Sequence, residues 1–188
     1  MEKQERQVII DQLNASRDRL LGLVDWLTAE QWEFRPAADR WSINQCLEHV
    51  TRVERRVLGN IEKKLRDEAP EPEKRDPKHE KDAVVAQALP DRSIPRSAPE
   101  PVQPVGEWPD AAELLAAFGA TRRRTTEFTA STPGDLRSYF IPHGAFGDLD
   151  CYQWLIALSL HGARHAEQIE EIRAAPGFPR ATASPASA

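Results

Sequence analysis

Two histidines four residues apart, His161 and His165, are the residues whose type and spacing most clearly suggest chemistry. Four residues make about one helical turn, so both imidazoles would leave the same face of a helix. Imidazole is the commonest metal-ligating side chain, and two on one turn supply half of a metal site. The alternative is structural, with both rings buried in a core and hydrogen-bonded to neighbouring side chains.

A third ligand would have to come from elsewhere in the chain, and His49 is the first candidate. Periodicity places His49 about 100° from the middle of the apolar face of its helix, at the rim of that face. Cys46, one turn earlier, lies nearer the middle. Adding Cys46 and His49 to the pair would make a closed structural zinc site, whereas Cys46 alone is more simply a small buried hydrophobic residue.

Other residues whose side chains could take part in catalysis or binding have simpler explanations. Position 162 is glycine, so the glutamate of a His-Glu-x-x-His protease is absent and zincin-type peptide hydrolysis is not expected. His79 stands in a charged stretch and is interpreted as solvated. We also interpret the run Arg122–Arg124 as a solvated helix face rather than a clamp for phosphate or a thiol cofactor.

Four segments with helical periodicity would position these side chains. The first carries apolar residues from Ile9 to Leu27 at spacings of four and three, and ends near Glu30. The other three begin at capping-box patterns, which start at Ser42, Asp110 and Asp150. The last of them carries His161 and His165 on its apolar stripe.

The segment from 66 to 108 separates the second helix from the third. Nine of the 15 prolines fall between Pro70 and Pro109, and periodicity fails apart from a short helix predicted at Ala83–Leu89. So long a connection within one domain is either a functional lid or a mobile excursion. In the first case Trp108 and the proline-rich segment would cover a pocket.

The pattern of four amphipathic helices without a strand pattern predicts an all-α four-helix bundle. We expect one domain over residues 1–175 and a flexible tail over 176–188. The long second connection favours a crossover topology, because the second and third helices need not be antiparallel neighbours.

Composition limits the classes of function. The net charge of −5 gives no indication of a nucleic-acid partner. The apolar runs are too short for a membrane span, and the first six residues do not resemble a signal peptide, so a cytoplasmic protein is expected. The two cysteines, Cys46 and Cys151, provide no disulfide framework.

Three motifs in order resemble the DinB/YfiT-like superfamily. The stretch 41–50, WSINQCLEHV, resembles its second-helix motif, in which a Trp-Ser pair precedes a histidine. The stretch 143–149, HGAFGDL, resembles the loop into its last helix. Trp154 followed by His161-x-x-x-His165-x-x-Gln168-Ile169 resembles its last-helix signature. One departure is that Pro142 precedes His143 where the family often has His-Pro, which leaves the role of His143 open.

The resemblance implies an up-down-down-up bundle, frequent homodimers, and a metal held by His49, His161 and His165. Zn²⁺ is the first choice for the metal, with Ni²⁺, Mn²⁺ and Fe²⁺ as alternatives, because an all-imidazole site does not discriminate sharply. Glu48, Glu167 and Gln168 adjoin these ligands. Gln168 is the best candidate to contact a ligand, and Glu167 is better explained as a surface residue.

Family members include transferases and isomerases that use bacillithiol or mycothiol, and others are described as metal-dependent hydrolases. The first hypothesis is therefore an S-transferase that activates a low-molecular-weight thiol toward a small-molecule electrophile. The second is a hydrolase that uses metal-bound hydroxide. The third is a non-catalytic metal-binding bundle, for example in a stress response. No catalytic acid or base can be assigned from the sequence.

Overall fold

The computed structural model describes residues 1–76, 78–93, 97–108 and 110–180, so Pro109 and residues 181–188 of the predicted tail lie outside the described residues. The helices are α1 (Lys3–Val24), α2 (Ala29–Glu33), α3 (Ile43–Asp67), α4 (Glu80–Ala88), α5 (Ala111–Ser131) and α6 (Cys151–Ala174). Three 3₁₀ turns are η1 (Pro72–Lys74), η2 (Glu100–Val102) and η3 (Leu136–Ser138), and two strands are β1 (Phe140–His143) and β2 (Gly147–Asp150).

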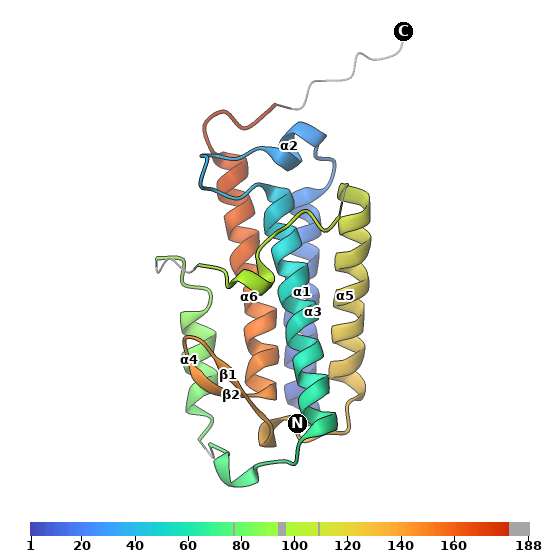
Figure 1. Ribbon diagram of the computed structural model, residues 1–188, viewed down its shortest axis with the longest axis vertical. Coiled ribbons are helices and arrows are strands. Elements are labelled where there is room, and N and C mark those ends of the chain that lie inside the picture. Colours follow the sequence, from blue (N-terminus) through green and yellow to red (C-terminus); the bar gives the residue numbers. More distant parts are fainter. Residues whose placement is uncertain (77, 94–96, 109, 181–188) are drawn as a thin grey trace.

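The four long helices α1, α3, α5 and α6 form a bundle, as the sequence predicts (Figure 1). α1 and α6 run in one direction, and α3 and α5 run in the other, which gives an up-down-down-up order. α5 can run parallel to α3 because the long connection returns along the outside of the bundle before α5 begins. Within this connection, α4 packs against α6, and η2 packs against α3.

The starts of the helices follow the predicted capping residues. The Ser42 hydroxyl accepts a hydrogen bond from the Gln45 amide at 3.2 Å, and the Gln45 side chain accepts one from the Ser42 amide at 3.1 Å. Asp150 and Gln153 form the same reciprocal pair at the start of α6. The side chain of Asp110 accepts a bond from the Glu113 amide at the start of α5. These caps satisfy amide groups that a helix start otherwise leaves unpaired.

The first helix is shorter than predicted. α1 ends at Val24 rather than near Glu30, because Asp25 is extended and Trp26 has a left-handed backbone (φ 61°). A new capping box between Thr28 and Gln31 then starts α2 as a separate short helix. The apolar spacing of the sequence continues through this break, so periodicity alone misplaces the end of the helix.

The loop into the last helix contains strands that the sequence analysis did not predict. β1 and β2 pair in antiparallel register, with Phe140 opposite Asp150 and His143 opposite Gly147. Gly147 takes a left-handed backbone (φ 68°) at the turn, which is a conformation that favours glycine. Each strand has only four residues, and Leu149 and Asp150, the two buried ones, are adjacent, so the hairpin produces no recognisable alternation of apolar and polar residues.

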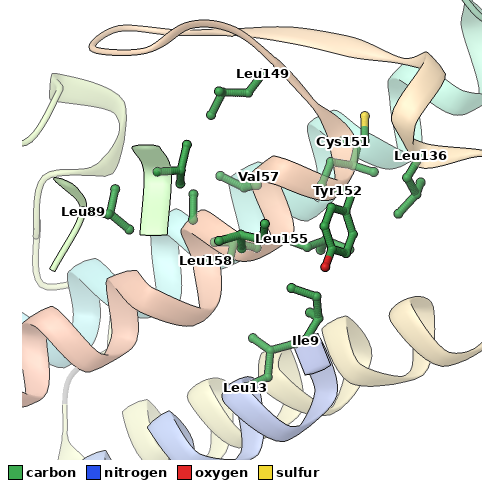
Figure 2. Packing of buried hydrophobic residues seen from close by; sticks show 14 residues of the cluster. Ile9, Leu13, Val57, Leu89, Leu136, Leu149, Cys151, Tyr152, Leu155 and Leu158 are labelled. Atoms are coloured by element: carbon green, nitrogen blue, oxygen red, sulfur yellow. The ribbon is translucent and has the colours of Figure 1, made fainter. Parts of the chain in front are cut away.

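Two apolar clusters fill the bundle, one at each end. The cluster at the hairpin end includes Ile9 and Leu13 of α1, with Tyr152, Leu155 and Leu158 of α6 (Figure 2). The cluster at the α2 end includes Leu20, Leu47, Leu114, Phe118 and Ile169. Along each long helix a polar residue separates the two clusters: Ser16 in α1, Glu54 in α3, Arg122 in α5 and His161 in α6. The bundle therefore has a polar layer between two apolar halves.

Helix α6 approaches this polar layer closely at Gly162. A Cβ added there would lie 3.1 Å from the Ser16 hydroxyl and 3.4 Å from Nη2 of Arg122. The glycine that separates the histidine pair therefore provides room for the side chains of α1 and α5.

None of the helices in the described part of the chain has an apolar stretch that could span a membrane.

Candidate metal centre

Three histidines from two helices converge on one point. His49 comes from α3, and His161 and His165 come from consecutive turns of α6. One ring nitrogen of each lies within 4.8 Å of the others, and in the described part of the chain no other His, Cys, Asp or Glu side chains group in this way. The ring centroids are 4.5 to 5.1 Å apart. The structure thus brings together the three histidines that the family resemblance implies.

Hydrogen bonds at Nδ1 orient two of the rings. Nδ1 of His49 lies 2.7 Å from the backbone carbonyl oxygen of Val102, and Nδ1 of His165 lies 2.9 Å from Oε1 of Gln168. Oxygens of this kind accept, so each Nδ1 carries the proton and donates it. Nε2 of both rings is consequently left without a proton, as a metal ligand requires.

The separations of the nitrogens fit a bound cation. Nε2 of His161 and Nε2 of His165 are 3.1 Å apart. Two nitrogens on one tetrahedral Zn²⁺, each at about 2.0–2.1 Å, stand roughly 3.4 Å from each other. A small closing movement of the rings, whose nitrogens all lie within 4.8 Å, would complete the set. The donor set therefore suits a divalent metal that accepts imidazole ligands.

All three imidazoles are held in the neutral form. Burial lowers the pKa of His49, and the nearby Arg52 lowers it further, against the hydrogen bond to Val102. Burial, together with the repulsion that a protonated His49 would exert, lowers the pKa of His165 to about 3. Burial, then His165 and His49, lowers the pKa of His161 well below its usual value. Neutral imidazole is the form that ligates metals, so near neutral pH the three rings are in the form that a metal site would need.

His49 is more buried than its helix periodicity predicts. The side chain was expected at the rim of the apolar face, yet it is only 4% exposed. The reason is that η2 of the long connection lies over α3 there and supplies the Val102 carbonyl. On another side the ring of Trp41 packs against His49 at 4.8 Å between centroids, and against His165 at 6.2 Å.

The remaining sequence candidates lie outside this group. Cys46 is fully buried, and burial raises the pKa of its thiol to about 12, so it behaves as a hydrophobic residue rather than a thiolate ligand. Nδ1 of His79, the residue before α4, lies 3.7 Å from Oδ2 of Asp82. The ring of His143 packs at a tilt against the rings of Phe146 in the hairpin turn and Trp154 in α6. Neither histidine belongs to the converging group.

The interpretation of Arg122 as a solvated residue was wrong. Its side chain is 1% exposed, and its Nη2 lies 2.8 Å from Glu54 Oε2. It also donates to the Leu13 carbonyl and to the Ser16 hydroxyl. Arg122 follows Phe118 by one helical turn, which was the available sign that it faces the interior. Arg123 and Arg124 are exposed, as expected.

Two residues that the sequence analysis placed beside the candidate ligands are Gln168 and Glu48. Gln168 reaches His165, as its place one turn later suggested. Glu48, 3% exposed, turns away to bind backbone amides of the long connection. The sequence carries no sign of Val102 as a partner of His49, because a backbone carbonyl has no residue signature.

A cavity of about 570 Å³ between α1 and α5 is lined by Trp26 and Leu115 and contains none of the three histidines.

Comparisons with known proteins place these features in context. Residues 12–169 match the model of the DinB superfamily. An uncharacterized protein of Bacillus subtilis, YuaE, is 27% identical over 147 residues, which cover 78% of this chain and 86% of that protein. The solved structure of Bacillus subtilis YfiT matches 93% of this chain and 89% of its own with a TM-score of 0.65 and 15% sequence identity. YfiT is described as a probable metal-dependent hydrolase with an unusual four-helix bundle topology.

Proposed function

Because this chain belongs to the DinB superfamily, and because three neutral imidazoles meet at one point in its bundle, we propose that it is a metal-dependent enzyme. His49, His161 and His165 would hold one divalent cation through Nε2. The observation that carries the proposal is the pair of Nδ1 hydrogen bonds, to Val102 and Gln168, that leave Nε2 of His49 and His165 without a proton.

A divalent cation held by three neutral ligands retains its full charge and lowers the pKa of a water or thiol bound to it. Zn²⁺ is our first choice, and Ni²⁺, Mn²⁺ and Fe²⁺ are the alternatives that imidazole also binds. The role of the chain itself is to present neutral nitrogens and to keep the surroundings dry, since His49 and His165 are 4% and 6% exposed.

We propose a low-molecular-weight thiol as the nucleophile, which would make the protein an S-transferase acting on a small electrophile. The two buried carboxylates of α3 are already committed, Glu48 to backbone amides and Glu54 to Arg122. The nucleophile must therefore lose its proton without help from either of them. A thiol has an ordinary pKa of about 8.5, so on the metal it would ionise more completely than water, which the metal must bring from about 15.7 to about 7.

Hydrolysis is the second candidate, and the structural neighbour YfiT favours it, since YfiT is described as a probable metal-dependent hydrolase. In that case water would be the nucleophile at the same three histidines. A non-catalytic role would leave the site able to bind a metal but unable to accept a further ligand.

Cobalt substitution tests these candidates. We expect Co²⁺-loaded protein titrated with 2-mercaptoethanol to develop a saturable sulfur-to-cobalt absorption band, and a matched titration with its S-methyl ether to give none. Bound cobalt without the thiol band would contradict the transferase proposal, and turnover of an activated ester by that protein would then support hydrolysis. A protein that binds no cobalt would contradict the metal site itself.

A further inference from the structure

Part of the long connection is fastened to α3 beside the candidate metal site. We call residues 100–108 the covering segment. Within it, three consecutive amides, those of Val105, Gly106 and Glu107, donate to the carboxylate of Glu48 at 2.8, 3.1 and 3.2 Å. Glu48 is only 3% exposed, so these bonds are shielded from water. One side chain of α3 therefore binds three backbone groups of the segment.

Two arginines extend the attachment along the same face of α3. Arg52 and Arg55 follow Glu48 by four and seven residues, the spacing of one helical stripe. Nη1 of Arg52 lies 2.5 Å from Oε2 of Glu107, and Nη1 of Arg55 lies 2.9 Å from Oε1 of Glu107. Nη2 of Arg52 also donates to the Pro101 carbonyl at 3.3 Å. The segment is thus held on both sides of Val102.

This attachment determines where the Val102 carbonyl lies. That carbonyl accepts the Nδ1 proton of His49 at 2.7 Å. An imidazole whose Nδ1 lacks a fixed acceptor can carry its proton on either nitrogen, and only one of the two forms leaves Nε2 free. The ligating form of His49 therefore depends on a backbone group that no side-chain substitution can remove directly.

We propose that Glu48 is a positioning residue for the metal site, acting through the covering segment. Glu48 holds the segment so that the Val102 carbonyl keeps the proton of His49 on Nδ1 and its Nε2 free to face His161 and His165. The inference rests on the metal site of the proposed function, but on no particular reaction. Coupling of this kind is reciprocal, so a bound metal would in turn hold the segment in place.

Two variants loosen the segment from opposite sides. Glu48→Ala removes the acceptor of the three amides. Gly106→Val leaves α3 intact but places a branched side chain at a left-handed position (φ 73°), with nothing within 4 Å of its Cβ, so it acts through backbone strain alone. Glu48→Gln keeps one acceptor oxygen and should restore part of the effect. Glu127→Ala, which removes an exposed carboxylate of α5, is the control.

The first measurement is the ¹⁵N spectrum of the His49 side chain in metal-free protein at pH 7. We expect the Nδ1-protonated form in the wild type and in Glu127→Ala, and a mixture of forms in Glu48→Ala and Gly106→Val. The second is the Zn²⁺ dissociation constant by competition with a chelator. Loss of an outer hydrogen-bond partner typically weakens metal binding about 10- to 100-fold, and we expect this from both variants.

An unchanged His49 spectrum together with an unchanged Zn²⁺ affinity in Glu48→Ala would overturn the inference. If that variant does not fold, Gly106→Val decides by the same two measurements. Hydrogen exchange in the wild type is a further criterion, because Zn²⁺ should slow exchange at Val105, Gly106 and Glu107, and no slowing would also overturn it. Wild type that binds no Zn²⁺ would contradict the proposed function, while the spectra of metal-free protein would still decide on Glu48.

Discussion

His165 shows how its surroundings tune a single residue of the site. Burial, and the repulsion that a protonated His49 would exert, lower its pKa to about 3, whereas in the unfolded chain imidazole takes up a proton near pH 6.5. Between these values the unfolded state binds more protons than the folded state. The neutral ring therefore makes its full contribution to the free energy of unfolding above about pH 6.5. This contribution is lost as the pH falls below that value.

We predict that metal-free protein loses about 1.4 kcal/mol of unfolding free energy through His165 alone when the pH is lowered from 7.5 to 5.5. His49 and His161 act in the same direction, because burial lowers the pKa of each. Urea unfolding at the two pH values measures the change, and His165→Leu should show a smaller one. Equal stability of the wild type at both pH values would mean that the rings are not held neutral by the fold.

At the scale of single residues, the sequence predicted which side chains lie together but not which backbone groups they contact. The spacing of His161, His165 and Gln168 on one helix was enough to place them together. His49 required the family motif, because its own periodicity indicates the rim. The carbonyl of Val102 has no signature, since any residue supplies one. Arg122 was misassigned because its neighbours Arg123 and Arg124 are exposed and the run was treated as a unit.

At the scale of the elements, the ion pair between Arg122 and Glu54 joins α5 to α3 in the polar layer. Both side chains are almost completely buried, at 1% and 2% exposure, so each depends on the other for compensation of its charge. Arg122 also reaches α1 through the Leu13 carbonyl and the Ser16 hydroxyl. This arginine therefore connects three of the four long helices.

We predict that Arg122→Met, which leaves Glu54 buried without a partner, lowers the unfolding free energy by about 3–5 kcal/mol. The double variant Glu54→Leu with Arg122→Met should recover most of the loss, because it removes the uncompensated charge. Arg123→Met, an exposed neighbour, should change stability by less than about 0.5 kcal/mol. Urea unfolding compares the four proteins, and a double variant no more stable than Arg122→Met would argue against charge burial as the cause.

The elements themselves were largely predictable. Capping patterns at Ser42, Asp110 and Asp150 marked three helix starts correctly, because a cap is a local hydrogen bond between residues three apart. The end of α1 was misplaced because a single left-handed residue, Trp26, interrupts an apolar pattern that continues beyond it. The hairpin was missed because its strands have four residues each and show no alternation of buried and exposed side chains.

At the scale of the whole molecule, the two apolar clusters fill the bundle on either side of the polar layer that contains His161. Neither cluster includes any of the three histidines proposed as metal ligands. We therefore predict that removal of metal by a chelator leaves the helical circular dichroism unchanged and lowers the melting temperature only in proportion to the binding free energy. Loss of helix on chelation would show instead that the metal is structural.

The up-down-down-up order also belongs to this scale, and it explains why the connection is long. A chain that must return from the end of α3 to the start of a parallel α5 needs many residues outside the bundle (Figure 1). The long connection in the sequence favoured such a crossover. It could not predict that residues 100–108 would lie on α3 beside His49, because that placement depends on contacts between segments far apart in the chain.

The most direct test of the account is the metal content of the protein and of its five single histidine-to-alanine variants. Wild type loaded with Zn²⁺ and freed of excess metal should retain one ion per chain. His49→Ala, His161→Ala and His165→Ala should each lose most of it, whereas His79→Ala and His143→Ala should match the wild type. A His161→Ala protein that keeps the wild-type zinc content would contradict the three-histidine site.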